Sequence, residues 1–202
     1  MKLYDDKYAP NPRRVRIFLA EKGIEVPTQE VTIMKGAHKT SEFRKISPMS
    51  QVPAIELDDG TCLTETLAIC RYFEATNPET PLFGRTPVEI GLVEMWQRRA
   101  ELNLMIPIAM FFRHTNEIMA GLEDQLPEWG EKNKPRITGG MKFFDAHLAG
   151  HDFIVGDYFS MADIVLLTAV DFAMFAGVPI ADDLVNLQAW YDRVSARPSA
   201  KA

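Results

Sequence analysis

The strand-like segments of this chain all lie before residue 65, whereas every segment after residue 87 has the apolar spacing of a helix. The expected strands are residues 2–4, 26–33, 54–57 and 61–63, with a helix at residues 12–22 between the first two. The turn formers Asp58-Asp59-Gly60 join the last two strands in a hairpin. A strand, a helix and a strand followed by a hairpin and a helix favour an α/β unit with a sheet of mixed pairing.

A second part of the chain is predicted to be entirely helical. It follows residues 77–87, which contain three prolines and a glycine and should form an irregular connection. The later pattern predicts helices at residues 88–119, 123–148, 161–176 and 187–196, with a kink in the first of them at Pro107. We therefore expect two domains, residues 1–80 and residues 88–202.

The segment near residue 50 suits a peptide-like ligand. Pro53 follows Val52 at the start of an expected strand, a position that favours a cis peptide bond and leaves the backbone N–H and C=O of Val52 free. The next helix begins at Glu65-Thr66, where unpaired N–H groups attract a carboxylate and the Glu65 side chain can pair with an ammonium group. Together these features predict a site for a ligand with a peptide-like backbone and a free amino-acid group.

Gln51-Val52-Pro53 and Glu65-Thr66 resemble the glutathione site of the cytosolic glutathione transferase family, with Thr66 at a position where Ser is commoner. Residues 156–164 resemble the capping box of the same family, with Ser160 as the N-cap and Asp163 as the reciprocal acid. The resemblance extends over nearly all of the 202 residues. It implies the glutathione transferase fold, an α/β thioredoxin-like N-terminal domain followed by an all-α C-terminal domain.

The resemblance also implies roles for the anchoring residues. The backbone of Val52 would pair with the cysteinyl part of glutathione, and Glu65 and Thr66 would hold its γ-glutamyl end. Gln51 and Lys39 are candidates for the glycyl end, with His38 a weaker one. The expected glutathione-binding residues are Asn11, Lys39, Gln51, Val52, Pro53, Glu65 and Thr66.

The position expected to activate the thiol departs from the commonest family pattern. Many relatives carry Ser, Cys or Tyr where this chain has Ala9, but some bacterial and fungal relatives lack that residue and carry Asn after Pro, as this chain does at Asn11. A thiol with a pKa of about 8.5 is mostly protonated at neutral pH and needs a donor to stabilise its thiolate. Asn11 can supply its side-chain amide, aided by the N–H groups of Arg13 and Arg14. The structural alternative is that Asn11 and Pro12 are the N-cap and first residue of a helix.

His114 is the second catalytic candidate. The resemblance to the atypical fungal subgroup implies a His here that supports the thiolate or a bound water, although an isolated His on a helix is more often structural. The spacing of Pro107, Met110, Phe111 and His114 puts them on one helix face. That face is expected to line an apolar pocket for an electrophile, and packing in the core is the alternative.

Charge and cysteine content limit the other classes of function. The net charge of −6 disfavours nucleic acid as a partner. The first 50 residues nevertheless hold ten Lys and Arg against six Asp and Glu, which suits an anionic peptide, although a scatter of solvated surface charges explains the same count. Cys62 and Cys70 have neither a redox nor a zinc spacing, so we expect two structural thiols in a reducing compartment.

Neither a metal site nor a membrane segment is expected. His147 and His151 have the spacing of two ligands on a helix, but Gly150 interrupts the helix that they would need. The longest apolar stretch, residues 164–176, is too short to span a bilayer, and the N-terminus lacks the apolar segment of a signal peptide. We therefore expect a cytoplasmic protein.

The expected function is that of a glutathione transferase with a role in detoxification. The enzyme would bind reduced glutathione, stabilise its thiolate and conjugate it to small, largely apolar electrophiles. One alternative is a glutathione-dependent disulfide reductase or peroxidase, which the absence of a hydroxyl at Ala9 favours. The other is a non-catalytic protein that binds glutathione or another ligand. The resemblance further implies a homodimer.

Overall fold

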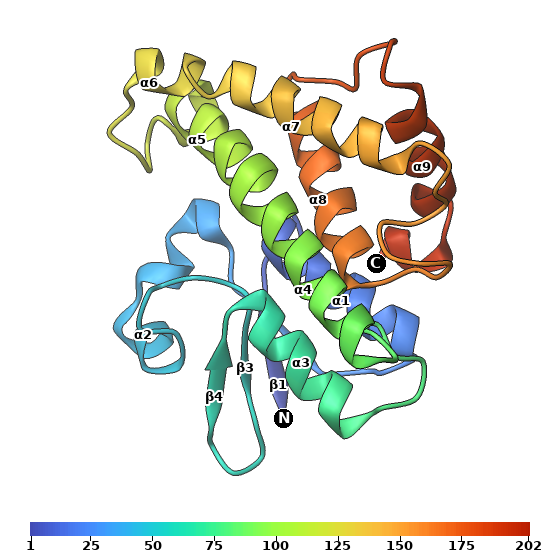
Figure 1. Ribbon diagram of the computed structural model, residues 1–202. Coiled ribbons are helices and arrows are strands. Elements are labelled where there is room, and N and C mark those ends of the chain that lie inside the picture. The colour runs from blue at the N-terminus through green and yellow to red at the C-terminus, as the bar shows by residue number, and fades with distance from the viewer. The chain divides into compact units, whose positions relative to one another are not determined.

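The N-terminal sheet is built around strand β1 (Lys2–Asp5), whose last three residues are buried. In the computed structural model, which describes residues 1–202, β1 pairs in parallel with β2 (Thr28–Glu30) and antiparallel with β3 (Ala54–Glu56). Strand β4 (Cys62–Thr64) completes the sheet in the order β2-β1-β3-β4, of which Figure 1 labels β1, β3 and β4 side by side. The predicted α/β fold with mixed strand pairing is confirmed.

Helices pack on this sheet within the same unit. Helix α1 (Pro10–Lys22) ends at Gly23, whose φ of 65° is the left-handed conformation that glycine adopts without cost. Helix α3 (Thr66–Thr76) contacts α1, β3 and β4, and the short helix α2 (Ser41–Ile46) contacts β3. Two 3₁₀ turns, η1 (Ile33–Lys35) and η2 (Ala37–Lys39), precede α2.

One local prediction in this unit needs correction, and one helix was not predicted. The strand expected at residues 26–33 is limited to Thr28–Glu30, because the chain turns into η1 where the Ile33 N–H donates to the carboxylate of Asp6 at 2.8 Å. Helix α2 was not predicted, although the Thr40 hydroxyl that accepts the Phe43 N–H at 3.2 Å is an ordinary N-cap.

The second unit is helical and starts with a long helical run. Helix α4 (Pro87–Ala100) continues through a π-helical turn, η3 (Glu101–Met105), into α5 (Ile106–Thr115), and Figure 1 shows the run as continuous. Pro107 lacks an N–H and its ring crowds the preceding turn, and the wider π turn before it accommodates both effects. The predicted kink is therefore a π turn, and the run ends at Thr115 rather than at Met119.

The remaining helices include one further correction. The single helix expected at residues 123–148 is two helices, because prolines occupy the first turn of each. They are followed by two more helices and a terminal 3₁₀ turn. The elements after α5 are η4 (Glu117–Met119), α6 (Pro127–Glu131), α7 (Lys134–Leu148), α8 (Met161–Phe175), α9 (Val185–Ser195) and η5 (Pro198–Lys201).

The predicted capping box at the start of α8 is present. The backbone N–H of Ser160 donates to the carboxylate of Asp163 at 3.0 Å. In return, the Ser160 side chain accepts the backbone N–H of Asp163. The same carboxylate accepts the Ile154 N–H at 3.0 Å and the Trp190 indole N–H at 2.9 Å. Burial raises the pKa of Asp163, and these donors act in the opposite direction.

The chain thus divides into two units. The N-terminal unit is Met1–Pro81 with Lys201–Ala202, and the helical unit is Leu82–Ala200. No helix in either unit is long and apolar enough to cross a lipid bilayer.

Candidate functional site

A small pocket in the N-terminal unit collects most of the predicted anchoring residues. Three segments form it: the start of α1, the loop before β3, and the junction of β4 with α3. Its lining residues are Asn11, Ser47, Met49, Gln51, Val52, Pro53, Thr64, Glu65 and Thr66. Of the predicted glutathione-binding residues, only Lys39 is not part of this lining.

Val52 presents an unpaired backbone to this pocket. Its peptide bond to Pro53 is cis, and neither its N–H nor its C=O has a hydrogen-bond partner in the protein. The Val52 side chain is buried in a core cluster with Tyr4 and Phe43, and this packing holds the Val52 backbone in place. The arrangement can therefore bind the N–H and C=O of an extended peptide.

Ser47 shapes the loop before Val52, a role that was not predicted from the sequence. Its hydroxyl donates to the Gln51 C=O at 2.8 Å and accepts the Gln51 N–H at 3.1 Å. Ser50, between them, has a φ of 56°, a left-handed conformation that the turn imposes on a residue other than glycine. The full burial of Ser47 is the structural sign of its role, and only its place in the motif could have indicated it in the sequence.

The start of α3 provides a site for an anion. Glu65 is the N-cap residue with φ 66° and ψ 123°, and no side chain caps the helix. The Ile69 N–H bonds to the Glu65 C=O at 3.0 Å, while the N–H groups of the first three helical residues have no partner. Free N–H groups at a helix N-terminus favour a carboxylate. The exposed Glu65 and the buried Thr66 lie at the same point.

Asn11 is not the N-cap of α1, which corrects the structural alternative. The helix begins at Pro10, and its N-cap is Ala9, because proline is favoured in a first helical turn. Asn11 is the second helical residue and is exposed, and neither its side chain nor its backbone N–H makes a hydrogen bond within the protein.

The early start of α1 also changes which backbone donors are free. The Arg13 N–H is directed to the Ala9 C=O at 3.4 Å, and the Arg14 N–H follows the regular helical pattern. Pro10 and Pro12 have no N–H. The one free backbone donor in this turn is therefore that of Asn11, and not those of Arg13 and Arg14 as predicted.

Two of the three candidates for the glycyl end, His38 and Lys39, lie together in η2. Lys39 is exposed, and the Nδ1 atom of His38 is buried without a partner. Burial and the neighbouring Lys39 charge lower the pKa of His38, so its ring is neutral at neutral pH. Lys39 is then the cation that this turn offers.

The predicted electrophile face belongs to α5. Pro107 and Phe111 are buried, and Met110 and His114 are half-buried. The Nδ1 atom of His114 accepts the Leu126 N–H at 3.3 Å, which ties the end of α5 to the segment before α6. The Nε2 atom of His114 is the ring nitrogen left for any other task.

Neither cysteine contributes to the pocket. Cys62 is half-buried on β4, and Cys70 is fully buried in α3. Burial raises the pKa of both thiols, so both are protonated at neutral pH. Any thiolate chemistry at this pocket must come from a bound thiol.

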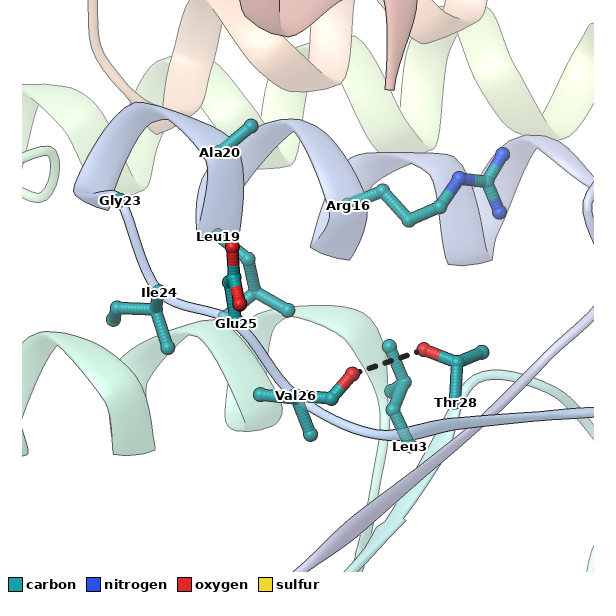
Figure 2. Close-up of a pocket in the computed structure, with 9 residues that line it drawn as sticks. All are labelled: Leu3, Arg16, Leu19, Ala20, Gly23, Ile24, Glu25, Val26 and Thr28. Atoms are coloured by element: carbon teal, nitrogen blue, oxygen red, sulfur yellow. Dashed lines mark hydrogen bonds between the residues drawn. The ribbon is translucent and has the colours of Figure 1, made fainter.

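A larger pocket, of about 380 Å³, lies elsewhere in the N-terminal unit, between α1 and the segment that leads into β2 (Figure 2). Its walls include Leu3, Leu19 and Ile24, with the Glu25 side chain directed toward α1. Figure 2 places Arg16 at one end, with its guanidinium directed away from Ile24. None of the predicted site residues lines it.

The histidine pair at the end of α7 forms a stack. The rings of His147 and His151 lie 5.3 Å apart, and the other face of His147 stacks on Trp96 at 3.7 Å. The His147 Nε2 atom bonds to the Ile154 C=O at 2.9 Å. No three side chains of His, Cys, Asp or Glu are grouped as metal ligands.

Comparison with known proteins places these features in a family. The family models described as the N-terminal and C-terminal domains of glutathione S-transferase match residues 8–76 and 105–198. Glutathione S-transferase 2 of Saccharomyces cerevisiae is 38% identical over 206 residues, which cover 100% of this chain and 88% of the yeast protein.

Solved structures agree with this result. The crystal structure of Gtt2 from Saccharomyces cerevisiae matches with a TM-score of 0.93 and 38% identity, covering 100% of this chain and 99% of that one. A glutathione S-transferase domain-containing protein of Marinobacter aquaeolei matches with a TM-score of 0.94 and 41% identity, covering 98% and 99% of the two chains. The chain therefore belongs to the glutathione S-transferase family and is a glutathione transferase.

Proposed function

We propose that this enzyme binds reduced glutathione in the pocket between α1, the loop before β3 and the start of α3, and that Asn11 stabilises its thiolate. The thiolate then attacks small, largely apolar electrophiles. The observation that carries the proposal is that three sets of unpaired groups line one pocket: the backbone of Val52, the N-terminal N–H groups of α3, and both amides of Asn11.

Each set matches one part of the ligand. The Val52 N–H and C=O pair with the backbone of the cysteinyl residue, as they would with a neighbouring strand. The α-carboxylate of the γ-glutamyl residue accepts the free N–H groups of α3, and its ammonium pairs with Glu65. Gln51 and Lys39 hold the glycyl carboxylate. The sulfur is then directed toward the start of α1.

Asn11 supplies the donors for the sulfur. Its side-chain amide and its backbone N–H are both unused within the protein, and the N-terminus of α1 adds a favourable field for negative charge. Donors to a thiolate lower the pKa of the thiol. With no protein thiol in the pocket, glutathione is the nucleophile.

The other parts of the proposal concern the helical unit and the assembly. Pro107, Met110, Phe111 and His114 line the pocket for the electrophile, and the Nε2 atom of His114 supports the thiolate or a water bound to it. The enzyme acts as a homodimer in the cytoplasm, which its membership of the family supports.

Two assays, run side by side on purified protein, test this function. In the first, the glutathione thiolate displaces chloride from a chlorinated nitroarene and forms a thioether. In the second, it attacks a sulfur of hydroxyethyl disulfide, forms a mixed disulfide and releases the other half as a thiolate. We expect retention on immobilised glutathione and turnover in the first assay.

The other outcomes distinguish the alternatives. Turnover of the disulfide alone would replace conjugation by a reductase function. Saturable binding of glutathione without turnover in either assay would identify a binding protein, and the absence of both binding and turnover would reject the proposed site.

A further inference from the structure

The loop that leads into α1 is held by hydrogen bonds rather than by packing. Its side chains after Asp6 are Lys7 and Tyr8, which are exposed, the latter by 81%, and Ala9, which is half-buried. No large apolar side chain therefore anchors the backbone just before Asn11. Its position must depend on the polar groups that contact it.

Two side chains provide these contacts. The carboxylate of Asp6 accepts the Tyr8 N–H at 2.9 Å, and the Asp6 C=O accepts the Ala9 N–H at 3.0 Å. From α1, the Nη2 atom of Arg16 donates to the C=O of Lys7 at 3.0 Å. Arg16 is the one contact among these that joins the loop to the body of the helix.

Arg16 is itself held firmly. Its Nη1 atom lies 2.6 Å and 2.8 Å from the two carboxylate oxygens of Asp5. Asp5 is buried at the end of β1, and its C=O accepts the Val31 N–H at 2.7 Å. A planar guanidinium can bond a carboxylate and a carbonyl at the same time, whereas the ammonium of a lysine cannot hold both in that geometry.

We propose that Arg16 is a positioning residue for the thiol site: by clamping Asp5 and the Lys7 carbonyl, it sets the position of the first turn of α1 and hence of Asn11. The inference rests on the proposed function. The Asn11 side chain has no hydrogen bond of its own, so its position is set by the helical turn that carries it. Only three residues separate Asn11 from Lys7, whose carbonyl Arg16 holds.

The pocket beside α1 makes a substitution of Arg16 feasible. Arg16 lines that pocket, and its side chain is 20% exposed (Figure 2). A lysine ammonium there can remain close to Asp5 and in contact with water, so Arg16→Lys retains the charge while losing the fork that holds the loop.

The test measures the ionisation of the thiol of bound glutathione. The ultraviolet absorbance of the thiolate is recorded as the pH is raised. In Arg16→Lys we expect the titration to move to higher pH and kcat at neutral pH to fall by about tenfold or more, since small displacements of a catalytic group are costly. The KM for glutathione should change by less than about threefold, because its anchors belong to other segments. Raising the pH should restore part of kcat.

Arg193→Lys is the matched control. Arg193, in the helical unit, also bonds a carboxylate and a backbone carbonyl, here both of Asp152, with Nη2 at 2.9 Å from the carboxylate and Nη1 at 2.9 Å from the C=O. This variant makes the same chemical change and should leave the thiol titration as it is in the wild type. If both variants lose stability equally and only Arg16→Lys shifts the thiol titration, the shift results from a change in the position of Asn11 and not from a loss of stability.

The outcomes separate this inference from the proposed function. If wild-type protein does not lower the pKa of bound glutathione, the proposed function is wrong and the inference is wrong with it. If the wild type lowers it and Arg16→Lys lowers it equally, only the positioning role is rejected. If Arg16→Lys does not fold, Asp5→Asn removes the charge of the carboxylate that holds Arg16. The thiol titration of Asp5→Asn is then compared with that of the wild type in the same way.

Discussion

At the start of α1, Asn11 carries donors that the protein itself does not use. The sequence left two roles open for it, a helix cap and a donor to the thiolate. Because Ala9 is the N-cap and the Asn11 side chain has no hydrogen bond, the capping role is absent. Substitutions of Asn11 can therefore test the chemistry without a large change in stability.

Asn11→Asp and Asn11→Ala should differ in activity and not in stability. Both free energies of unfolding should stay within about 0.5 kcal/mol of the wild-type value, since an exposed site without a cap bond is being changed. The carboxylate of Asn11→Asp opposes a thiolate, so the pH at which bound glutathione ionises should rise and turnover should fall. Asn11→Ala keeps the backbone N–H and should show a smaller shift. Thiolate absorbance and denaturation measure the two properties, and wild-type turnover and titration in both variants would remove Asn11 from catalysis.

Glu65 permits a matched test of the anchoring site. Glu65→Gln keeps the side-chain shape at a residue whose φ is 66°, and removes only the charge. Loss of the pair with the γ-glutamyl ammonium should weaken glutathione binding by about 1–3 kcal/mol, measured by calorimetry. Glu25→Gln removes a charge of the same kind from the larger pocket and should have no effect. Equal affinities for the two variants would exclude the proposed orientation of the ligand.

Among the elements, the π turn η3 depends on its neighbour α7. A Cβ added at Gly140 would lie 3.0 Å from the Asn103 C=O and 3.2 Å from Leu104, both in η3. A Cβ added at the adjacent Gly139 would meet nothing within 4 Å. The close approach at Gly140 is therefore what lets α7 pack on the π turn.

Gly139→Ala and Gly140→Ala should consequently have opposite effects on stability. In the helix interior Gly139→Ala should raise the free energy of unfolding by about 0.5–1 kcal/mol, because alanine loses less backbone entropy. Gly140→Ala should lower it by about 1–3 kcal/mol through overpacking. Urea denaturation measures both, and a stabilised Gly140→Ala would show that η3 moves without cost.

The elements also show what the sequence could predict. Val52-Pro53 and Glu65-Thr66 combine a turn and a helix start whose chemistry is local, so the lining of the pocket followed largely from the residues themselves. Asn11 was misplaced because both Pro10 and Pro12 suit a first helical turn, and only the observed backbone decides between them. The length of β2 depends on the contact of Asp6 with Ile33, which is distant in sequence.

At the scale of the whole molecule, the proposed glutathione anchors all belong to one unit. Asn11, Lys39, Gln51, Val52 and Glu65 lie within Met1–Pro81, whereas the residues proposed for the electrophile lie within Leu82–Ala200. The sequence predicts two domains, residues 1–80 and 88–202, through the change from mixed to helical patterns. It could not show the role of Ser47, because a buried hydroxyl that bonds a loop twice has the same sequence signature as a surface serine.

The stability of the whole chain should depend on pH through His147. Burial against Trp96 and its neighbours is the main cause that lowers the pKa of His147 below its ordinary value of 6.5, and the nearby His151 and Arg99 add to the effect. The unfolded chain then binds the proton more readily than the folded one. The free energy of unfolding should therefore fall as pH decreases from the ordinary histidine pKa toward the lower value in the folded state.

His147→Phe should remove this part of the pH dependence. The aromatic ring can still stack on Trp96, while the titrating group and its bond to the Ile154 C=O are lost at every pH. We expect the wild type to lose more stability than the variant between pH 7 and about pH 5.5, measured by urea denaturation. Parallel curves for the two proteins would show that His147 does not titrate differently on folding.

The two prolines on either side of Asn11 also have a consequence for spectroscopy. In the segment from Pro10 to Pro12, only Asn11 contributes amide protons, from its backbone and from its side chain. In a ¹⁵N-labelled sample those signals would report on the negative charge of a bound sulfur without interference from either neighbour. The start of α1 thus contains its own nuclear magnetic resonance probe, which requires no label beyond the isotope.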